Sequence, residues 1–306
     1  MSLIRVIFSS LLIIWLAATL AFFALRVIPG DAIETQLIES GASASTIAER
    51  RAAAGLNAPL PAQYVDFLSG LWRGDLGVSL LDGRPVVQII LDHIEPTITL
   101  AISALAVAVS FGLVLGTFAA LNVGWGISTV SRVLISLALS VPIYWTGTIA
   151  IFVFTVQLNL LPSAGAGRLS QLILPAGVLG FHTAGAIGQV IEASIRETLK
   201  MDFVRTAYAK GLRERAVMVR HVLRASLLPA VTVIAAQAGF LLGGVVITEA
   251  LFNRPGIGSI LLDATLLQNY PVVQGIVVWS AIVYALMNGL ADLLYRLLDP
   301  RVRIYS

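Results

Sequence analysis

The stretch TITLAISALAVAVSFGLVLGTFAAL, residues 97–121, contains no charged side chain. Its apolar residues run continuously and do not alternate with polar ones, which favours a helix over a strand of a membrane barrel. About 20 residues of helix cross the hydrocarbon core of a bilayer. Because this stretch is longer than that, it predicts a membrane-spanning helix.

The composition of the whole chain extends this prediction. Of 306 residues, 58% are hydrophobic and 12% are charged, with a mean hydropathy of +0.90, whereas soluble domains carry about 25% charged residues. The sequence therefore predicts an all-α polytopic membrane protein with six transmembrane helices. The predicted spans are Val6–Ile28, Thr97–Leu121, Val133–Leu158, Leu172–Ala193, Leu227–Ala250 and Val272–Leu294.

The first apolar run is interpreted as an uncleaved span. A signal peptide has an apolar region of about 7–15 residues, and the run that begins at Val6 is longer. The chain has no cysteine, so it can form neither a disulfide framework nor a thiolate metal site.

The distribution of charge predicts the orientation. An even number of spans puts both termini on one side, together with Arg132 and the stretch Arg196–Arg224, which holds eight of the twenty lysines and arginines. Cytoplasmic loops carry an excess of Lys and Arg, so we expect both termini in the cytoplasm. Residues 29–95 then form an external segment, with four basic residues against nine acidic ones. We expect short helices there, either as a lid or docking element or as a solvated loop.

The basic stretch carries the signals of a helical hairpin. Asp202 is expected to cap a helix over Phe203–Lys210, and Gly211 to end it. Phe203, Ala207 and Lys210 would share one face of that helix. Arg213–Leu223 is predicted to be a second helix, which leads into the fifth span. From charge alone, an ordinary basic loop held at the lipid surface by anionic headgroups is the better explanation.

The residues of this region resemble a known family. DFVRTAYAKGLRER at 202–215 and RHVLRASLLP at 220–229 are similar to the coupling motif of ABC importer permeases, and most closely to the dipeptide, oligopeptide and nickel group. Pro229 follows Gly211 at a longer spacing than in the general importer pattern, which resembles the peptide-type subgroup and leaves open where the coupling helix ends. Further similar segments are PGD at 29–31, GLNAPLPAQY at 55–64, GDLGVS at 74–79, LLP at 160–162, LLGGVV at 241–246, PGIG at 255–258, NYPVVQG at 269–275 and DLLYRLLDPR at 292–301.

The resemblance implies one membrane subunit of a larger machine. Such a permease pairs with a second homologous permease in the bilayer, two cytoplasmic ATP-binding subunits bind the coupling loops, and an external solute-binding protein delivers the solute. Nucleic acid is not an expected partner. The implied function is the transmembrane permease subunit of an ATP-driven importer of di- or oligopeptides or similar small solutes, in the prokaryotic cytoplasmic (inner) membrane. The implied ATPase-coupling residues are Asp202, Phe203, Arg205, Thr206, Ala207, Ala209, Lys210, Gly211 and Leu212.

The predicted spans and the resemblance together divide the chain into three parts. They are a first transmembrane helix at 1–28, the external segment at 29–95, and a transmembrane domain at 96–306 with its coupling loop at 196–228. Selectivity in this architecture depends largely on the binding protein, so the substrate stays open between peptides, nickel chelates, glutathione and sugars.

The chain lacks the motifs of an enzyme. A P-loop needs a lysine followed by Ser or Thr to hold phosphate and Mg²⁺, and neither Lys200 nor Lys210 is followed by either. We therefore expect no cofactor in this chain, with ATP and Mg²⁺ on partner subunits. The three histidines form no HExxH motif, and the segment 256–260 lacks the last glycine of a nucleophile elbow.

Several polar and small residues of the spans also lead to predictions, and some of them allow more than one interpretation. Glu249 is expected at the outer end of the fifth span, where it lines an outer gate, contacts a partner or simply emerges into water. Gln237 lines a polar path or bonds a neighbouring helix. The i,i+4 pairs Glu192–Arg196 and Asp292–Arg296 are predicted to be local salt bridges. Gly112 with Gly116, and Gly239 with Gly243, are predicted to allow close helix packing. A secondary transporter that works alone is the competing hypothesis.

Overall fold

The computed structural model describes residues 3–27, 33, 43–53, 55–121, 125–242 and 245–298. Every named element in these ranges is a helix, which confirms the all-α class. The elements are α1 (Leu3–Val27), α3 (Ala44–Ala53), α4 (Leu60–Trp72), α5 (Val86–Ala120), α6 (Trp125–Ser140), α7 (Ile143–Ala150), the π-helix η1 (Ile151–Gln157), α8 (Ser170–Thr198), α9 (Asp202–Ala209), α10 (Glu214–Val217), the π-helix η2 (Met218–Leu223), α11 (Arg224–Leu242), α12 (Val246–Leu251), α13 (Ile257–Leu266) and α14 (Tyr270–Leu298).

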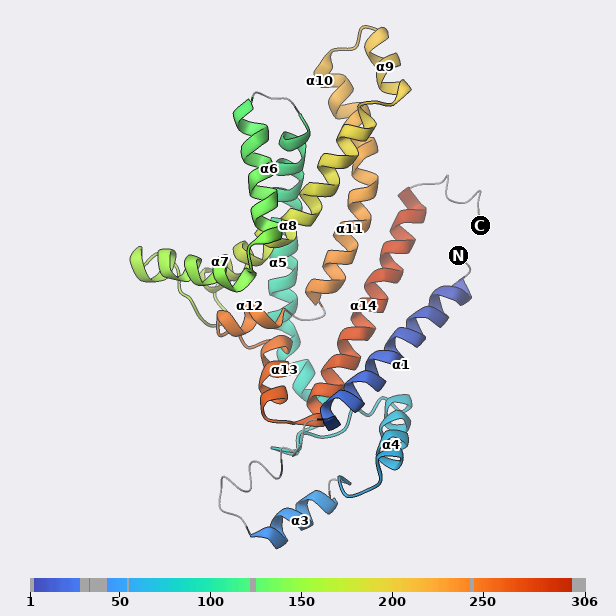
Figure 1. Cartoon of the computed structure of the whole chain (residues 1–306), viewed down its shortest axis with the longest axis vertical. Helices are drawn as coiled ribbons and strands as arrows, with labels where there is room; N and C mark the ends of the chain where they lie inside the picture. Colours follow the sequence, from blue (N-terminus) through green and yellow to red (C-terminus); the bar gives the residue numbers. More distant parts are fainter. Residues whose placement is uncertain are drawn as a thin grey trace.

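Five helical segments of the described chain are long and apolar enough to cross a membrane, and α6 with α7 and η1 would make a sixth. Figure 1 shows α9 and α10 at one end of the molecule and α3 and α4 at the opposite end. The long helices α5, α8, α11 and α14 lie between these two ends.

The third predicted span is wrong as a continuous helix. The chain bends by 109° between α6 and α7–η1, so that α7 runs across the direction of α6 in Figure 1. Pro142 stands at the bend in an extended conformation, with φ −62° and ψ 137°. Proline has no N–H to donate to the preceding turn, and it disfavours a helical conformation in the residue before it. The apolar run continues past this residue, which is why composition alone does not reveal the break.

Two further boundaries differ from the predicted ones. The second span begins at Val86 instead of Thr97, with Pro96 inside the helix, so the predicted boundary between residues 95 and 96 falls within α5. The fifth span begins at Glu214, because α10, η2 and α11 form one helical segment that ends at Leu242. The second helix of the predicted hairpin is thus the first part of that span, and Ala250 belongs to α12.

The packing of α5 on α8 forms the centre of the bundle. A Cβ atom at Gly112 would lie 2.8 Å from Ile187, and one at Gly116 would lie 2.5 Å from the carbonyl oxygen of Gly188. Only glycine permits this approach, which confirms the packing role of the first glycine pair. A Cβ at Gly239 would lie 3.2 Å from Met287 of α14, whereas Gly243 is outside the described residues.

The external segment contains the expected short helices α3 and α4. The side chain of α4 residue Tyr64 lies 2.8 Å from the hydroxyl of Thr19 on α1. Gln63 accepts two hydrogen bonds from the guanidinium of Arg26, at 3.1 and 2.9 Å. These contacts fix α4 against the end of α1.

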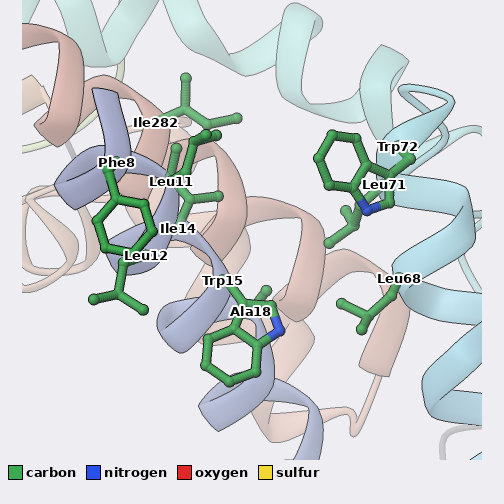
Figure 2. A pocket seen from close by; sticks show the side chains of 10 residues that line it. All are labelled: Phe8, Leu11, Leu12, Ile14, Trp15, Ala18, Leu68, Leu71, Trp72 and Ile282. Carbon is green, nitrogen blue, oxygen red and sulfur yellow. The ribbon is translucent and has the colours of Figure 1, made fainter. Parts of the chain in front are cut away.

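An apolar pocket of about 480 Å³ opens between α1, α4 and α14. Figure 2 shows the side chains of α1, among them Trp15, on one side of it and Leu68, Leu71 and Trp72 of α4 on the other. The described residues that line it are apolar or aromatic and none is charged, so the pocket offers no charged group to bind an ionised solute.

Candidate functional site

The candidate coupling helix is α9, at the end of the molecule opposite α3 and α4 (Figure 1). It begins one residue earlier than predicted: Met201 is the extended N-cap residue, with ψ 147°, and Asp202 is already helical. A carboxylate in the first turn still stabilises the positive end of the helix dipole. Asp202 also lies 3.8 Å from Arg205 in an exposed ion pair, which contributes little to stability.

Gly211 ends α9 as predicted. Its φ is +75°, a region in which residues other than glycine are strained. Its N–H bonds to the carbonyl of Tyr208, and the N–H of Leu212 bonds to the carbonyl of Ala207. These two bonds form a Schellman motif, which satisfies the last carbonyls of the helix. Apart from its chain neighbours, no atom of the described residues lies within 4 Å of a Cβ built at Gly211, so the requirement for glycine comes from the backbone.

One face of α9 packs on the bundle. Val204 and Ala207 are 1% and 5% exposed, and they share an apolar cluster with Ile195 of α8 and Val217 of α10. The predicted coupling residue Ala207 therefore packs against α8 and α10, whereas Phe203 and Lys210, at i−4 and i+3 from it, stay exposed. Val204 is a positioning residue that the sequence reasoning missed. Its signal was its spacing of three residues from Ala207, which places two small apolar side chains on one face.

The flanks of that buried face and the rest of α9 are open. Phe203 and Tyr208 are 44% and 42% exposed, and Leu212 follows the helix with similar exposure. The side chains of Arg205 and Lys210 are exposed beside them. Tyr208 was not among the predicted coupling residues, although an exposed aromatic side chain on a short helix is a typical contact residue. The remaining predicted residues, Asp202, Thr206, Ala209 and Gly211, are also exposed.

Two features lie where the spans on either side of α9 meet it. Ser226 of α11 donates a buried hydrogen bond to Thr198, the last residue of α8, at 3.1 Å. The π-helix η2 lies between α10 and α11, and such segments are frequent at functional sites. The ends of α8 and α11 next to α9 are therefore bonded to each other.

The predicted salt bridge between Glu192 and Arg196 is confirmed, with a distance of 2.8 Å. Arg132 of α6 binds the same carboxylate oxygen at 3.1 Å, which the sequence did not indicate. The side chains of Asp292 and Arg296 lie outside the described residues.

Glu249 lies inside the protein, with 0% of its surface exposed, so the interpretation that it emerges into water is wrong. Its carboxylate accepts hydrogen bonds from the Thr97 hydroxyl at 2.6 Å and from the N–H groups of Gly258 and Ser259 at 2.7 and 3.1 Å. The glutamate thus joins α12 to α5 and to the first turn of α13. Gln237 is half-buried on α11, and its place in a solute pathway stays a prediction.

Comparison with known proteins decides the family. Residues 112–304 match the model of the binding-protein-dependent transport system inner membrane component, and residues 1–101 match the model of the N-terminal part of such components. The chain belongs to this family. It is the permease component of an ABC importer, which decides against a secondary transporter that works alone.

Relatives with assigned names cover nearly the whole permease. The permease is 37% identical over 285 residues to the glutathione transport system permease protein GsiC of Pectobacterium atrosepticum. The aligned region covers 93% of this chain and 92% of the relative. The permease is 34% identical over 308 residues to the probable peptide ABC transporter permease protein y4tP of Sinorhizobium fredii, with 98% of each chain covered.

Solved structures show the same fold. An inward-facing structure of the MetNI methionine ABC transporter matches 69% of the permease and 97% of its own chain, with a TM-score of 0.56 and 15% identity. An amino acid ABC transporter matches with a TM-score of 0.52 and 13% identity. At this identity the likeness shows the fold alone.

The family also fixes the division of labour. The permease is not an enzyme, and ATPase activity belongs to partner subunits. It works in the inner membrane with an ATPase and a solute-binding protein.

Proposed function

We propose that this permease imports short peptides or peptide-like solutes such as glutathione. The observation that carries the proposal is the identity of 37% and 34% to permeases named for glutathione and peptide transport, each over more than nine-tenths of the chain. A nickel chelate or a sugar has no comparable support among these relatives.

We further propose that α9 is the surface on which a cytoplasmic ATPase docks. Its exposed side combines the apolar side chains of Phe203, Tyr208 and Leu212 with the cations Arg205 and Lys210. This combination fits an apolar cleft with acidic residues on its rim, because buried aromatic anchors supply affinity and charges at the rim steer association. Val204 and Ala207 support the helix from behind.

The proposed assembly contains this permease, a second homologous permease and two ATPase subunits that hold ATP and Mg²⁺. We place both termini in the cytoplasm, because α14 runs toward the end that carries α9 and α1 runs away from it (Figure 1). The external solute-binding protein then meets the end that carries α3 and α4. Closure of the ATPase dimer would draw the two coupling helices together and turn the spans from inward- to outward-facing.

Cross-linking tests the docking role of α9. The chain has no cysteine, so a single introduced cysteine reports one position. Phe203→Cys and Tyr208→Cys should cross-link to the ATPase in the complete complex. Leu91 is 62% exposed on α5 near the other end of the molecule, and Leu91→Cys should not cross-link to the ATPase. An assembled complex in which neither α9 position cross-links would contradict the docking role.

Transport by the complete complex tests the substrate. The complex with its own binding protein is reconstituted in liposomes and supplied with a labelled dipeptide, glutathione, a nickel chelate or a sugar. We expect ATP-dependent uptake of the dipeptide or glutathione. Uptake restricted to the nickel chelate or the sugar would refute the proposed substrate class without affecting the role of α9.

A further inference from the structure

The cytoplasmic end of α8 carries one carboxylate between two guanidinium groups. Oε1 of Glu192 lies 3.1 Å from Nε of Arg132 and 2.8 Å from a terminal nitrogen of Arg196. Both arginines also donate to the carbonyl oxygen of Ala119, at distances between 3.1 and 3.3 Å. Glu192 and Arg196 belong to α8, Arg132 to α6 and Ala119 to the last turn of α5. This group of four residues therefore joins three helices.

The balance between attraction and repulsion in this group depends on the negative charge of Glu192. Two guanidinium groups converge on one carbonyl, and like charges at such a distance repel each other. The carboxylate lies between them and is only 17% exposed, whereas the arginine side chains are 44% and 46% exposed. The carbonyl of Ala119 is one of the last four of α5, and helix ends of this kind attract cations. Without the negative charge of Glu192, the attraction between α6 and α8 becomes a repulsion.

The same three helices are packed tightly next to the charged group. A Cβ at Gly116 of α5 would lie 2.9 Å from Ile191 of α8, and one at Gly185 of α8 would lie 2.9 Å from Ala138 of α6. Small residues at these contacts bring the backbones together with little room for sliding. The charged group thus lies at the end of this close-packed interface that is nearer to α9.

The position of the group relates it to α9. Glu192 lies less than two turns before the end of α8 at Thr198, and α9 begins at Asp202. Ile195, one turn from Glu192, is in the apolar cluster that holds Val204 and Ala207 of α9. Any force on α9 therefore reaches α8 at the turn that the arginines hold.

We propose that Glu192 is a positioning residue for coupling: it makes α5, α6 and α8 move together when the ATPase displaces α9. The inference rests on the proposed docking role of α9. Glu192 contacts neither solute nor ATP in this scheme. It determines whether movement of α9 turns the bundle or only bends the end of α8.

The experiment replaces Glu192 in the complete complex and measures transported solute per ATP in liposomes. Glu192→Gln keeps the shape of the side chain and removes its charge. We expect transport per ATP to fall roughly tenfold, within the range typical of allosteric coupling, with basal ATPase activity retained. Glu192→Asp, which keeps the charge, should restore part of the loss. Asp92→Asn is the matched control, because it breaks the exposed ion pair with Arg84 near the external end and should change neither quantity.

A second variant and a second readout separate coupling from folding and from docking. Arg132→Gln removes only the link to α6 and leaves the Glu192–Arg196 pair, so it should uncouple transport even if Glu192→Gln fails to assemble. Each variant also carries Ala209→Cys, at an exposed position of α9 that is not one of the proposed anchors. Suppose that Arg132→Gln, and Glu192→Gln if it assembles, keep the cross-link and show unchanged transport per ATP. This result would overturn the proposed role of Glu192 and leave the docking role of α9 intact. Loss of the cross-link in the parent complex overturns the docking role of α9, and this inference with it.

Discussion

At the scale of single residues, Gly211 is required for its backbone conformation and not because a side chain would lack room. Its φ of +75° and the open surroundings of its Cα mean that a side chain would strain the turn without a clash. In the left-handed region this strain costs about 1–2 kcal/mol, and more for a β-branched residue. A strained turn redirects α9 or loosens its last hydrogen bonds.

We therefore expect Gly211→Val to insert and assemble normally but to lose substrate-stimulated ATPase activity in liposomes. Gly55→Val is the matched control, because Gly55 has φ +71° and equally open surroundings in the external segment. It carries the same strain far from α9 and should retain stimulation. Normal stimulation in Gly211→Val would show that the turn does not need its present conformation.

Glu249 gives a prediction about stability. Its two oxygens accept three hydrogen bonds inside the protein, whereas glutamine at this position would turn an NH₂ group toward a donor. A buried group without its partner costs about 1–3 kcal/mol, so Glu249→Gln should lower the melting temperature of the purified permease. Asp263→Asn, an exposed carboxylate of α13, should leave it unchanged. Equal melting temperatures for Glu249→Gln and the parent would contradict this assignment.

At the scale of elements, the bend between α6 and α7 is held by a residue of a third helix. Nδ1 of His182 on α8 bonds the carbonyl of Ala138 at 2.8 Å, and its Nε2 lies 2.6 Å from the hydroxyl of Thr146. The imidazole thus joins the last part of α6 to the first turn of α7. Proline explains why the helix stops, and His182 explains why the two parts keep a defined angle.

His182→Ala should widen the range of angles at this bend. Spin labels on Val130→Cys of α6 and Val156→Cys of η1, both well exposed, would report it as a broadened distance distribution. His93→Ala is the control, because among the described residues that ring bonds the carbonyl of Ile89 in its own helix and no residue of another helix. An unchanged distribution in His182→Ala would mean that packing alone fixes the bend.

At the scale of the whole molecule, the two ends of the described structure present different elements. One end presents α9 with its cations, and the other presents α3 together with α4, which is bonded to α1. The positive-inside rule assigns the first end to the cytoplasm. All proposed contacts with ATPase and binding protein depend on this orientation.

Labelling of intact cells measures the orientation directly. Arg73→Cys, just after α4, and Arg215→Cys, in α10, replace exposed arginines at the two ends. A maleimide that does not cross the membrane should label the first variant in intact cells and the second only after the cells are opened. The reverse pattern would invert the topology and remove both the docking proposal and the cytoplasmic termini.

The features that the sequence determined by itself are those set by neighbouring residues. Continuous apolar runs predict helices, and the density of arginine predicts which side of the membrane a loop lies on. Gly211 predicts the end of α9. Each of these features depends on local chain geometry or on the lipid solvent. The resemblance in residues 202–229 was also local, and the family confirmed it.

What only the tertiary structure decided depends on partners far away in the chain. The bend after Ser140 is held by His182, the burial of Glu249 is completed by Thr97 of α5, and Arg132 meets Glu192 across 60 positions of sequence. Ala207 looked like a contact residue until α8 and α10 covered it. Local sequence sets which helices form, but the burial and pairing of a polar side chain are set by whichever helix packs beside it.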